Sequence, residues 1–74
     1  MEKTIDWNSF TEDEQHMICT AMCKKARYKV HDYFMRMLNL GHPRIVLGKG
    51  PEGNYCRIAQ ESEAVMKIIF DSYA

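Results

Sequence analysis

The sequence predicts an α+β fold in which one long N-terminal helix, a β-hairpin and a C-terminal helix follow one another in a single small domain over residues 1–74. Three observations predict this order. A long segment without Gly or Pro has helical spacing of its apolar residues, two β-prone runs then flank a glycine-rich turn, and the last segment is helical again. A chain of this length buries only about 60–65% of the surface that it exposes when unfolded, so its core is marginal.

The long helix is predicted from residue 11 to residue 39, after an N-terminal arm over residues 1–10. Two overlapping segments, 9–12 and 11–14, fit the capping-box pattern, and the acidic residues there complement the positive end of the helix dipole. The segment 41–43, Gly-His-Pro, marks the end, because glycine can adopt the left-handed cap and proline cannot continue a helix. A helix of roughly 28 residues is about 42 Å long.

The predicted helix has two apolar stripes. The broader stripe would face the core, and its members are Ile18, Cys19, Met22, Cys23, Ala26, Val30, Tyr33, Phe34 and Met37. The narrower stripe lies well away from it, and its members are Met17, Ala21, Tyr28 and Met35. A compact domain of this length has a radius of gyration of about 11 Å, so such a helix would protrude. We therefore expect the narrower stripe to bind a larger protein or a second copy of the chain in a homodimer.

Two alternatives compete with this interface. The C-terminal helix, together with Trp7 and Phe10, could cover the narrower stripe within one chain. The helix could also break near Lys24 and Lys25, which would bring its length closer to the width of the domain. The sequence leaves these alternatives open.

The β-hairpin is predicted over residues 44–59, where the runs Arg-Ile-Val-Leu and Tyr-Cys-Arg-Ile-Ala flank a glycine-rich tip. Pro51 at the second position of a turn and Gly53 at the fourth suit a type I turn. A lone hairpin is marginal in water, so it must pack on a helix. We expect residues 61–73 to form that helix, because two acidic residues open the segment and complement the positive end of the helix dipole. A third strand is the alternative for this segment, since Ile-Ile-Phe is β-prone.

The three cysteines, Cys19, Cys23 and Cys56, are expected to be small buried hydrophobes in a reducing compartment. His16 precedes the first two on the same helix face, so these four residues could in principle supply four zinc ligands. Familiar zinc sites use a C-x2-C knuckle in a turn, and the sequence has none. We therefore expect no metal and no cofactor.

The sequence contains no motif that supports catalysis. A cysteine nucleophile needs a histidine and an orienting group in one cleft, and His31 and His42 are weak candidates for that histidine. The segment Gly48-Lys49-Gly50 does not fit the phosphate-binding loop, because its glycines join two strands and no Ser or Thr follows the lysine. We expect that the protein is not an enzyme.

The formal net charge is zero, but the charges are segregated along the chain. Residues 1–16 carry one base and five acids, a net charge of −4. Residues 17–59 carry eight bases and two acids, a net charge of +6, and residues 60–74 carry one base and three acids, a net charge of −2. The basic middle segment could grip a phosphate backbone, chiefly through Lys24, Lys25, Arg27, Lys29, Lys49 and Arg57. Nucleic-acid binding is therefore the alternative function.

The sequence favours a small non-enzymatic protein-binding module that regulates or inhibits a larger cytoplasmic protein, as phage and plasmid accessory proteins often do. Six methionines suit an adaptable binding surface, and segregated charges steer association with a charged partner. No apolar run is long enough to cross a bilayer, and the first residues lack the apolar core of a secretory signal. We therefore expect a cytoplasmic protein without membrane contact.

Overall fold

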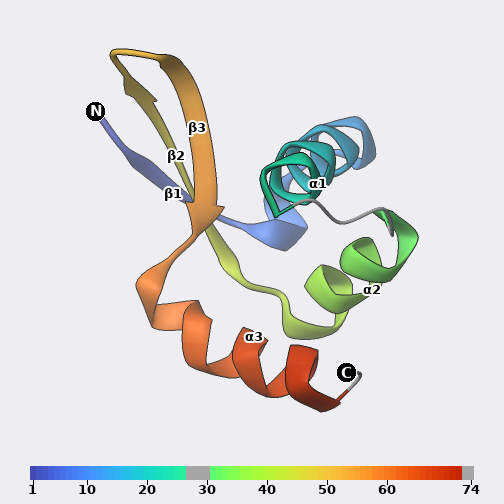
Figure 1. Cartoon of the computed structure of the whole chain (residues 1–74). Coiled ribbons are helices and arrows are strands. Elements are labelled where there is room, and N and C mark those ends of the chain that lie inside the picture. Colours follow the sequence, from blue (N-terminus) through green and yellow to red (C-terminus); the bar gives the residue numbers. More distant parts are fainter. Residues whose placement is uncertain (27–30, 73–74) are drawn as a thin grey trace.

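The computed structural model describes residues 1–26 and 31–72, with the side chains of all of these except 24–26. It has the α+β fold that the sequence predicts, and a short N-terminal strand precedes the first helix (Figure 1). In chain order the elements are β1 (Lys3–Asp6), a 3-10 turn (Trp7–Ser9), α1 (Glu12–Ala26), α2 (His31–Gly41), β2 (Arg44–Gly50), β3 (Gly53–Ile58) and α3 (Gln60–Ser72).

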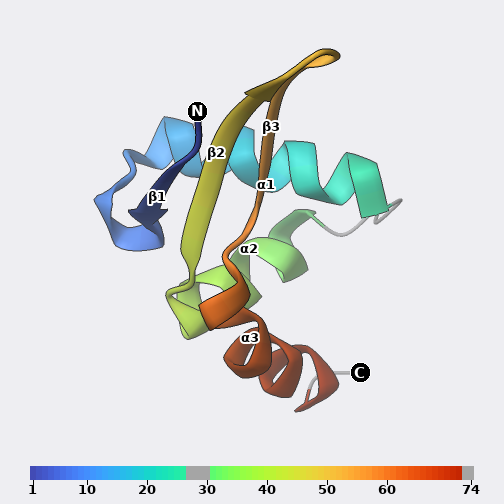
Figure 2. The same ribbon diagram turned by 90° about the vertical axis from the view of Figure 1, so that its left-hand side faces the viewer.

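The strands form an antiparallel sheet in the order β1-β2-β3. The helix α1 crosses behind one face of this sheet, and no described helix covers the other face (Figure 2). The helix α2 packs between α1 and α3, below the sheet in the view of Figure 1. The sheet therefore has one face toward the core and one face toward solvent.

The single long helix predicted over residues 11–39 is wrong, because two helices occupy this part of the chain. The Sγ of Cys19 lies 3.5 Å from the backbone oxygen of His31, and the rings of His16 and His31 stack with centroids 5.4 Å apart. In a continuous helix, fifteen residues would separate these rings by about 22 Å. The helix α2 therefore lies back against α1, and the residues that connect the two helices are outside the described part.

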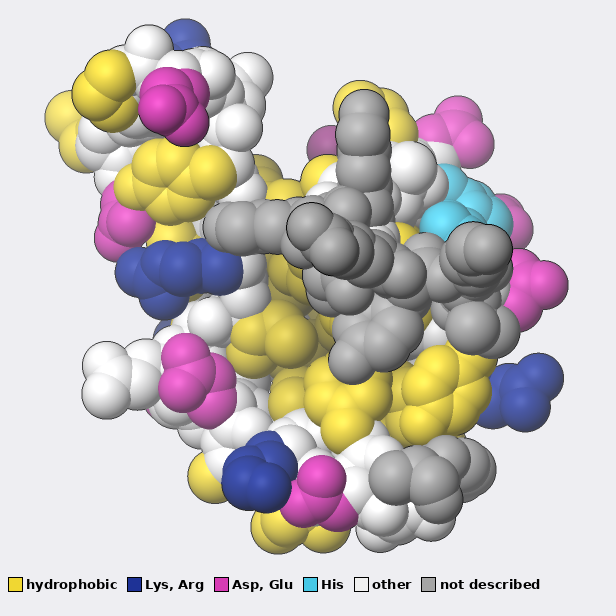
Figure 3. Space-filling model, in the orientation of Figure 1, with side chains coloured by type: hydrophobic (Ala, Val, Ile, Leu, Met, Phe, Trp, Pro, Cys, Tyr) yellow, Lys and Arg dark blue, Asp and Glu magenta, His cyan; other side chains and the backbone are white. Residues whose placement is uncertain are grey.

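Burial explains why the chain turns back. The molecule measures 35 × 25 × 21 Å, so a helix of about 42 Å would leave one end of its apolar stripe in water. Folding back places both halves of that stripe in one core. The buried members of this core are Trp7, Ile18, Cys19, Met22, Cys23, Phe34, Met37, Leu38, Ile45 and Met66. Figure 3 shows hydrophobic side chains reaching the surface at the level where α2 and α3 meet.

The N-terminal arm predicted over residues 1–10 is an edge strand followed by a tightly held tryptophan. Trp7 is completely buried; its backbone N–H donates to the oxygen of Pro43 at 2.9 Å, and its indole N–H donates to the Oδ1 of Asn39 at 2.7 Å. The side-chain amide of Gln15 donates to the oxygen of Trp7 at 2.9 Å. These bonds join the 3-10 turn that follows β1 to both α1 and α2, which fixes the C-terminal end of the first strand.

Thr11 and Glu14 form the capping box at the start of α1. The hydroxyl of Thr11 accepts from the N–H of Glu14 at 3.2 Å, and the carboxylate of Glu14 accepts from the N–H of Thr11 at 2.8 Å. The overlapping candidate at Ser9 is not the cap, because Ser9 lies in the preceding 3-10 turn. The second of the two predicted boxes therefore sets the helix start.

The end of α2 differs from the prediction in one residue. Gly41 was expected to adopt the left-handed cap, but His42 has the positive φ, 46°. Gly41 instead lies where α2 meets α3, and a Cβ there would overlap the Sδ of Met66 and come 2.9 Å from the Cδ1 of Ile69. The glycine at this position permits close helix packing and does not serve as the cap.

The hairpin is confirmed, with longer strands and a shorter tip than predicted. The ladder between β2 and β3 continues to the pair Gly50 and Gly53, which leaves only two residues in the turn. Gly53 has a φ of +113°, a conformation that favours glycine. The ring of Tyr55 lies over Gly48, its partner across the ladder, where a Cβ would collide with it. The C-terminal segment is a helix, and the strand alternative for it is wrong.

Candidate functional site

The solvent face of the sheet carries a network of ion pairs and hydrogen bonds. Side chains alternate along a strand, so the rows of the ladder decide which residues share a face. Thr4, Val46 and Arg57 form one row, and Asp6 is paired with Arg44 two positions along. The intervening rows contain Ile45, Leu47 and Ile58, among others, and point toward the helices. We call the first set, with Glu2 and Tyr55, the open face.

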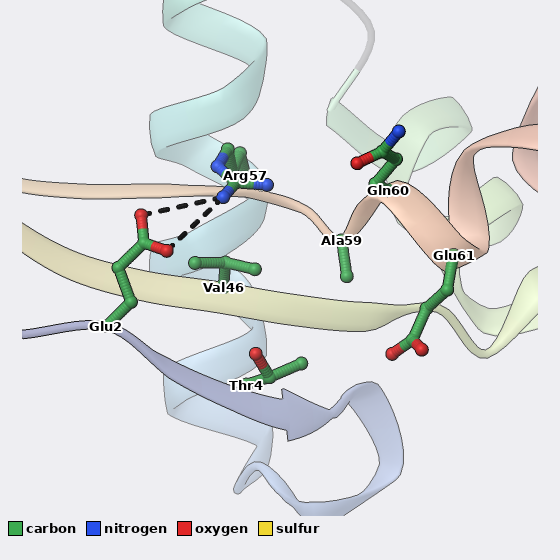
Figure 4. A pocket seen from close by; sticks show the side chains of 7 residues that line it. All are labelled: Glu2, Thr4, Val46, Arg57, Ala59, Gln60 and Glu61. Carbon is green, nitrogen blue, oxygen red and sulfur yellow. Dashed lines mark hydrogen bonds and ion pairs between the residues drawn. The ribbon is translucent and has the colours of Figure 1, made fainter.

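Glu2 connects the two outer strands across β2. Its carboxylate accepts a hydrogen bond from the hydroxyl of Tyr55 at 2.6 Å and lies 3.4 Å from the guanidinium of Arg57. Figure 4 shows Glu2 and Arg57 pointing toward each other, with Val46 between them on the central strand. The three side chains come from both edges of the sheet, so each position depends on the register of both ladders.

Arg44 makes the corresponding connection at the other end of the open face. Its Nε lies 3.2 Å from the carboxylate of Asp6, and its Nη1 lies 3.0 Å from that of Glu61. Its backbone N–H donates to the hydroxyl of Ser62, and its carbonyl oxygen accepts from the N–H of Ala59. Arg44 therefore ties the start of α3 to the sheet through side chain and backbone together.

A shallow depression of about 500 Å³ lies between these two groups (Figure 4). Its floor is apolar, because Val46 and Ala59 are only 4% and 5% exposed. The residues that line it are Glu2, Thr4, Val46, Arg57, Ala59, Gln60 and Glu61. A broad, open hollow with an apolar floor and charged walls suits contact with a protein surface better than enclosure of a small substrate.

The electrostatics of the open face favour the ionised form of the Glu2 carboxylate. The hydrogen bond from Tyr55 lowers the pKa of Glu2 and raises the pKa of Tyr55, and the charge of Arg57 lowers the pKa of Glu2 further. Three carboxylates, those of Glu2, Asp6 and the neighbouring Glu61 of α3, face two guanidinium groups, so the open face together with Glu61 has a net charge of about −1. Such a face does not attract phosphate.

The residues predicted to bind a partner do not form one stripe. Met17 is 72% exposed on α1, where Ala21 is exposed as well. Met35 belongs to α2 and is half-buried against the core, while Tyr28 lies outside the described residues. The predicted stripe requires one continuous helix. Because α1 and α2 are separate helices, Met17 and Ala21 lie on one and Met35 lies on the other.

The residues of the nucleic-acid alternative are only partly described. Arg27, Lys29 and the side chains of Lys24 and Lys25 lie outside the described part of the chain. Lys49 is exposed near the hairpin turn, and it belongs to a row on the opposite face from Arg57. Arg57 is already paired with Glu2. The described residues therefore do not assemble a basic surface from this set.

The thiols of Cys19 and Cys23 lie 3.9 Å apart in the core, on successive turns of α1. Burial raises the pKa of the Cys19 thiol to about 12, and the nearby Cys23 adds to this effect. A thiol in this environment stays protonated at neutral pH, which suppresses both nucleophilic attack and metal binding. Within residues 1–26 and 31–72, no group of three His, Cys, Asp or Glu side chains is arranged to hold a metal ion.

The open face was not predicted from the sequence, because the signal for its first strand is short and weak. Glu2, Thr4 and Asp6 alternate with Lys3 and Ile5, which is the pattern of a half-buried strand, but the run is very short and contains one large apolar residue. The partners of Glu2 and Asp6 lie 38 to 55 positions later in the chain. The alternation could have indicated a strand, but not the residues it would face.

Comparison with protein-family models, with curated proteins and with solved structures gives no match to the chain. In the described part of the chain, no helix combines the length and the apolar character that a membrane crossing requires.

Proposed function

We propose that the protein is a non-enzymatic binding module that docks a larger protein on the open face of its sheet, and that it regulates or inhibits that protein in the cytoplasm. The observation that carries this proposal is the network in which Glu2 fixes Tyr55 and Arg57 beside an apolar floor. A role like that of a phage or plasmid accessory protein fits such a module. The docking function does not depend on this role.

The residue types on the open face support protein recognition. Tyrosine and arginine are enriched where binding energy concentrates in protein interfaces, because each combines a large apolar surface with directional donors. Tyr55, Arg44 and Arg57 are between one third and one half exposed, so each can still contact a partner. Their contacts with carboxylates already restrict these side chains in the free protein. Fewer side-chain conformations are therefore lost on binding, which reduces the entropic cost of association.

The alternatives receive less support from the same residues. A net charge of about −1 on the open face opposes a nucleic-acid backbone, which requires basic groups that are not already paired. Cys19 and Cys23 are buried in the core, and burial raises the pKa of the Cys19 thiol, so this pair gives little support to a nucleophilic role. Crosslinks that nuclease treatment removes would indicate nucleic-acid binding instead.

Site-specific photocrosslinking in cells tests the proposal. A photoreactive residue replaces Thr4, which is exposed in the middle of the open face, and in a matched sample it replaces Met17, which is exposed on α1. We expect a discrete crosslinked protein from position 4 that is absent from position 17 and persists after nuclease treatment. Crosslinks that vanish with nuclease, or that are identical from both positions, would contradict the proposal.

A pair of arginine and lysine variants gives the matched control. Arg57→Ala removes a guanidinium of β3 from the open face. Lys49→Ala removes an ammonium of the neighbouring strand β2 from the opposite face of the sheet. The crosslinking yield from position 4 should fall about tenfold with Arg57→Ala, which corresponds to the loss of one strong interface contact. It should be unchanged with Lys49→Ala. Equal yields from the two variants would show that the open face does not bind the partner.

A further inference from the structure

A second hollow lies near the end of the sheet that carries the hairpin turn. Figure 2 shows the end of the hairpin formed by β2 and β3 extending past α1. The hollow has a volume of about 350 Å³, and Lys3, Leu47, Lys49 and Asn54 are among the residues that line it. We call it the hairpin hollow. It shares no lining residue with the depression of the open face.

The register of the two ladders brings the polar side chains of the hairpin hollow together. Lys3 is paired with Leu47 across β1 and β2, and Lys49 is paired with Asn54 across β2 and β3. Leu47 and Lys49 are two positions apart on one strand, so all four side chains lie on the face opposite the open face. Lys3 and Lys49 are diagonal neighbours, and the Cβ atoms of such a pair lie about 7–8 Å apart. Two long, flexible side chains at this spacing can direct both ammonium groups to a single anion.

The two lysines of the hollow are not neutralised by carboxylates. Arg44, Arg57 and Lys67 each form an ion pair with a carboxylate, at distances from 2.9 to 3.4 Å. In the described part of the chain, no carboxylate lies within ion-pair distance of Lys3 or Lys49, and both side chains are exposed. Like charges on neighbouring strands repel each other. An anion between the two ammonium groups would remove this repulsion.

The charge and the donor groups of the hollow fit a phosphate monoester. Such a group carries a charge of about −1.5 to −2 at neutral pH and has three strong acceptor oxygens. Two ammonium groups balance this charge, whereas a single carboxylate would leave one lysine without a counter-charge. The side-chain amide of Asn54 supplies further N–H donors. Leu47, which is half-buried beside the two lysines, limits the access of water and so strengthens the attraction.

We propose that the hairpin hollow is a binding site for a phosphate monoester, held by Lys3, Lys49 and Asn54. The same dianion is present on a phosphorylated side chain of a protein and in free phosphate. The site lies on the opposite face of the sheet from the proposed docking surface, so the two can be occupied together. Because exposed ion pairs contribute little free energy each, the dissociation constant should be about 0.1–10 mM.

NMR titrations of the full, isotope-labelled chain at neutral pH and constant ionic strength test the site. The probes are inorganic phosphate and three capped tripeptides whose central residue is phosphoserine, glutamate or serine. The backbone amide shifts of Lys49 and Asn54 should saturate with the phosphoserine peptide, with a dissociation constant at least about fivefold lower than with the glutamate peptide. The serine peptide should cause no saturable shift. Equal binding of the phosphoserine and glutamate peptides would overturn the proposal.

Inorganic phosphate should cause shifts at the same amides. If it binds more tightly than the phosphoserine peptide, the natural ligand is a free phosphate; if it binds more weakly, the ligand is a phosphorylated side chain. A single-stranded oligonucleotide, whose phosphodiesters carry one charge each, should bind more weakly per phosphate than the phosphoserine peptide. Tighter binding of the oligonucleotide would overturn the proposal in favour of a nucleic-acid site.

Two variants that each remove one positive charge give the matched control. Lys49→Gln changes a residue of the hollow, whereas Arg36→Gln changes an exposed residue of α2 that does not line it. The first should raise the dissociation constant of the phosphoserine peptide about fivefold or more, and the second less than about twofold. Equal losses would show that net charge alone attracts the probe, and would refute the site. Arg57→Ala should leave the titration unchanged, which separates this test from that of the open face.

Discussion

Replacement of Trp7 by Phe tests whether the first strand is held in place by one buried side chain. Trp7 is completely buried, and it is the only tryptophan in the sequence. The substitution keeps the backbone bond to Pro43 but removes the indole N–H that donates to Asn39 at 2.7 Å. Asn39 is exposed, so in the variant its side-chain oxygen can accept a hydrogen bond from water. The substitution therefore adds no free-energy cost for an unsatisfied buried acceptor.

Three contributions set the expected size of the effect. The lost hydrogen bond is worth about 1 kcal/mol. The missing ring atoms leave a cavity of roughly 40 Å³, which costs about 1 kcal/mol, and the lost burial of about 40 Å² of apolar surface costs about 1 kcal/mol more. The total of about 3 kcal/mol is a large share of the roughly 4–11 kcal/mol expected for a domain of this size. At about 6 °C per kcal/mol, the melting temperature should fall by about 18 °C.

Thermal unfolding followed by far-ultraviolet circular dichroism is the appropriate assay, because the Trp7→Phe variant has no tryptophan fluorescence. A double-mutant cycle with Asn39→Ala isolates the hydrogen bond, and the coupling free energy should be about 0.5–1.5 kcal/mol. If the two substitutions were additive, the indole–amide bond would contribute nothing. A fall in melting temperature of less than about 5 °C for Trp7→Phe would refute the anchoring role altogether.

Three further predictions concern single groups. Thr11→Ala should lower the free energy of unfolding by about 1 kcal/mol in urea titrations, because it breaks the capping box, whereas Ser9→Ala should change it little; equal effects would contradict the cap assignment. Tyr55→Phe should raise the pKa of Glu2 in NMR titrations, since the Tyr55 hydroxyl is the largest cause of its lowering. The lowered pKa stabilises the fold above the ordinary pKa of a glutamate, and this contribution disappears as the pH falls through the lowered value, so Tyr55→Phe should be less sensitive to acid over that interval. Cys19 should resist a thiol reagent at neutral pH, because burial raises its pKa to about 12, while the half-buried Cys56 should react faster; mass spectrometry showing modification of Cys19 first would refute this order.

The start of the first helix, the hairpin and the last helix follow from local sequence. The capping box at Thr11, the hairpin turn at Pro51 and the acidic start of the last helix each act through neighbouring residues, so their signals are complete within a few positions. The α+β class could be predicted for this reason. Glycine at position 41 shows the limit of this reasoning, because its role depends on Met66 in another helix.

The sequence by itself determined the class of the fold, the hairpin and the starts of the first and the last helix. The tertiary structure alone decided the turn back between α1 and α2, the pairing of β1 with β2, and hence the open face. The physical reason is that helical periodicity is the same in one helix as in two, and only the need to bury the whole apolar stripe in a small core distinguishes them. The partners of Glu2 and Arg44 are distant in sequence, so only the folded sheet brings them together.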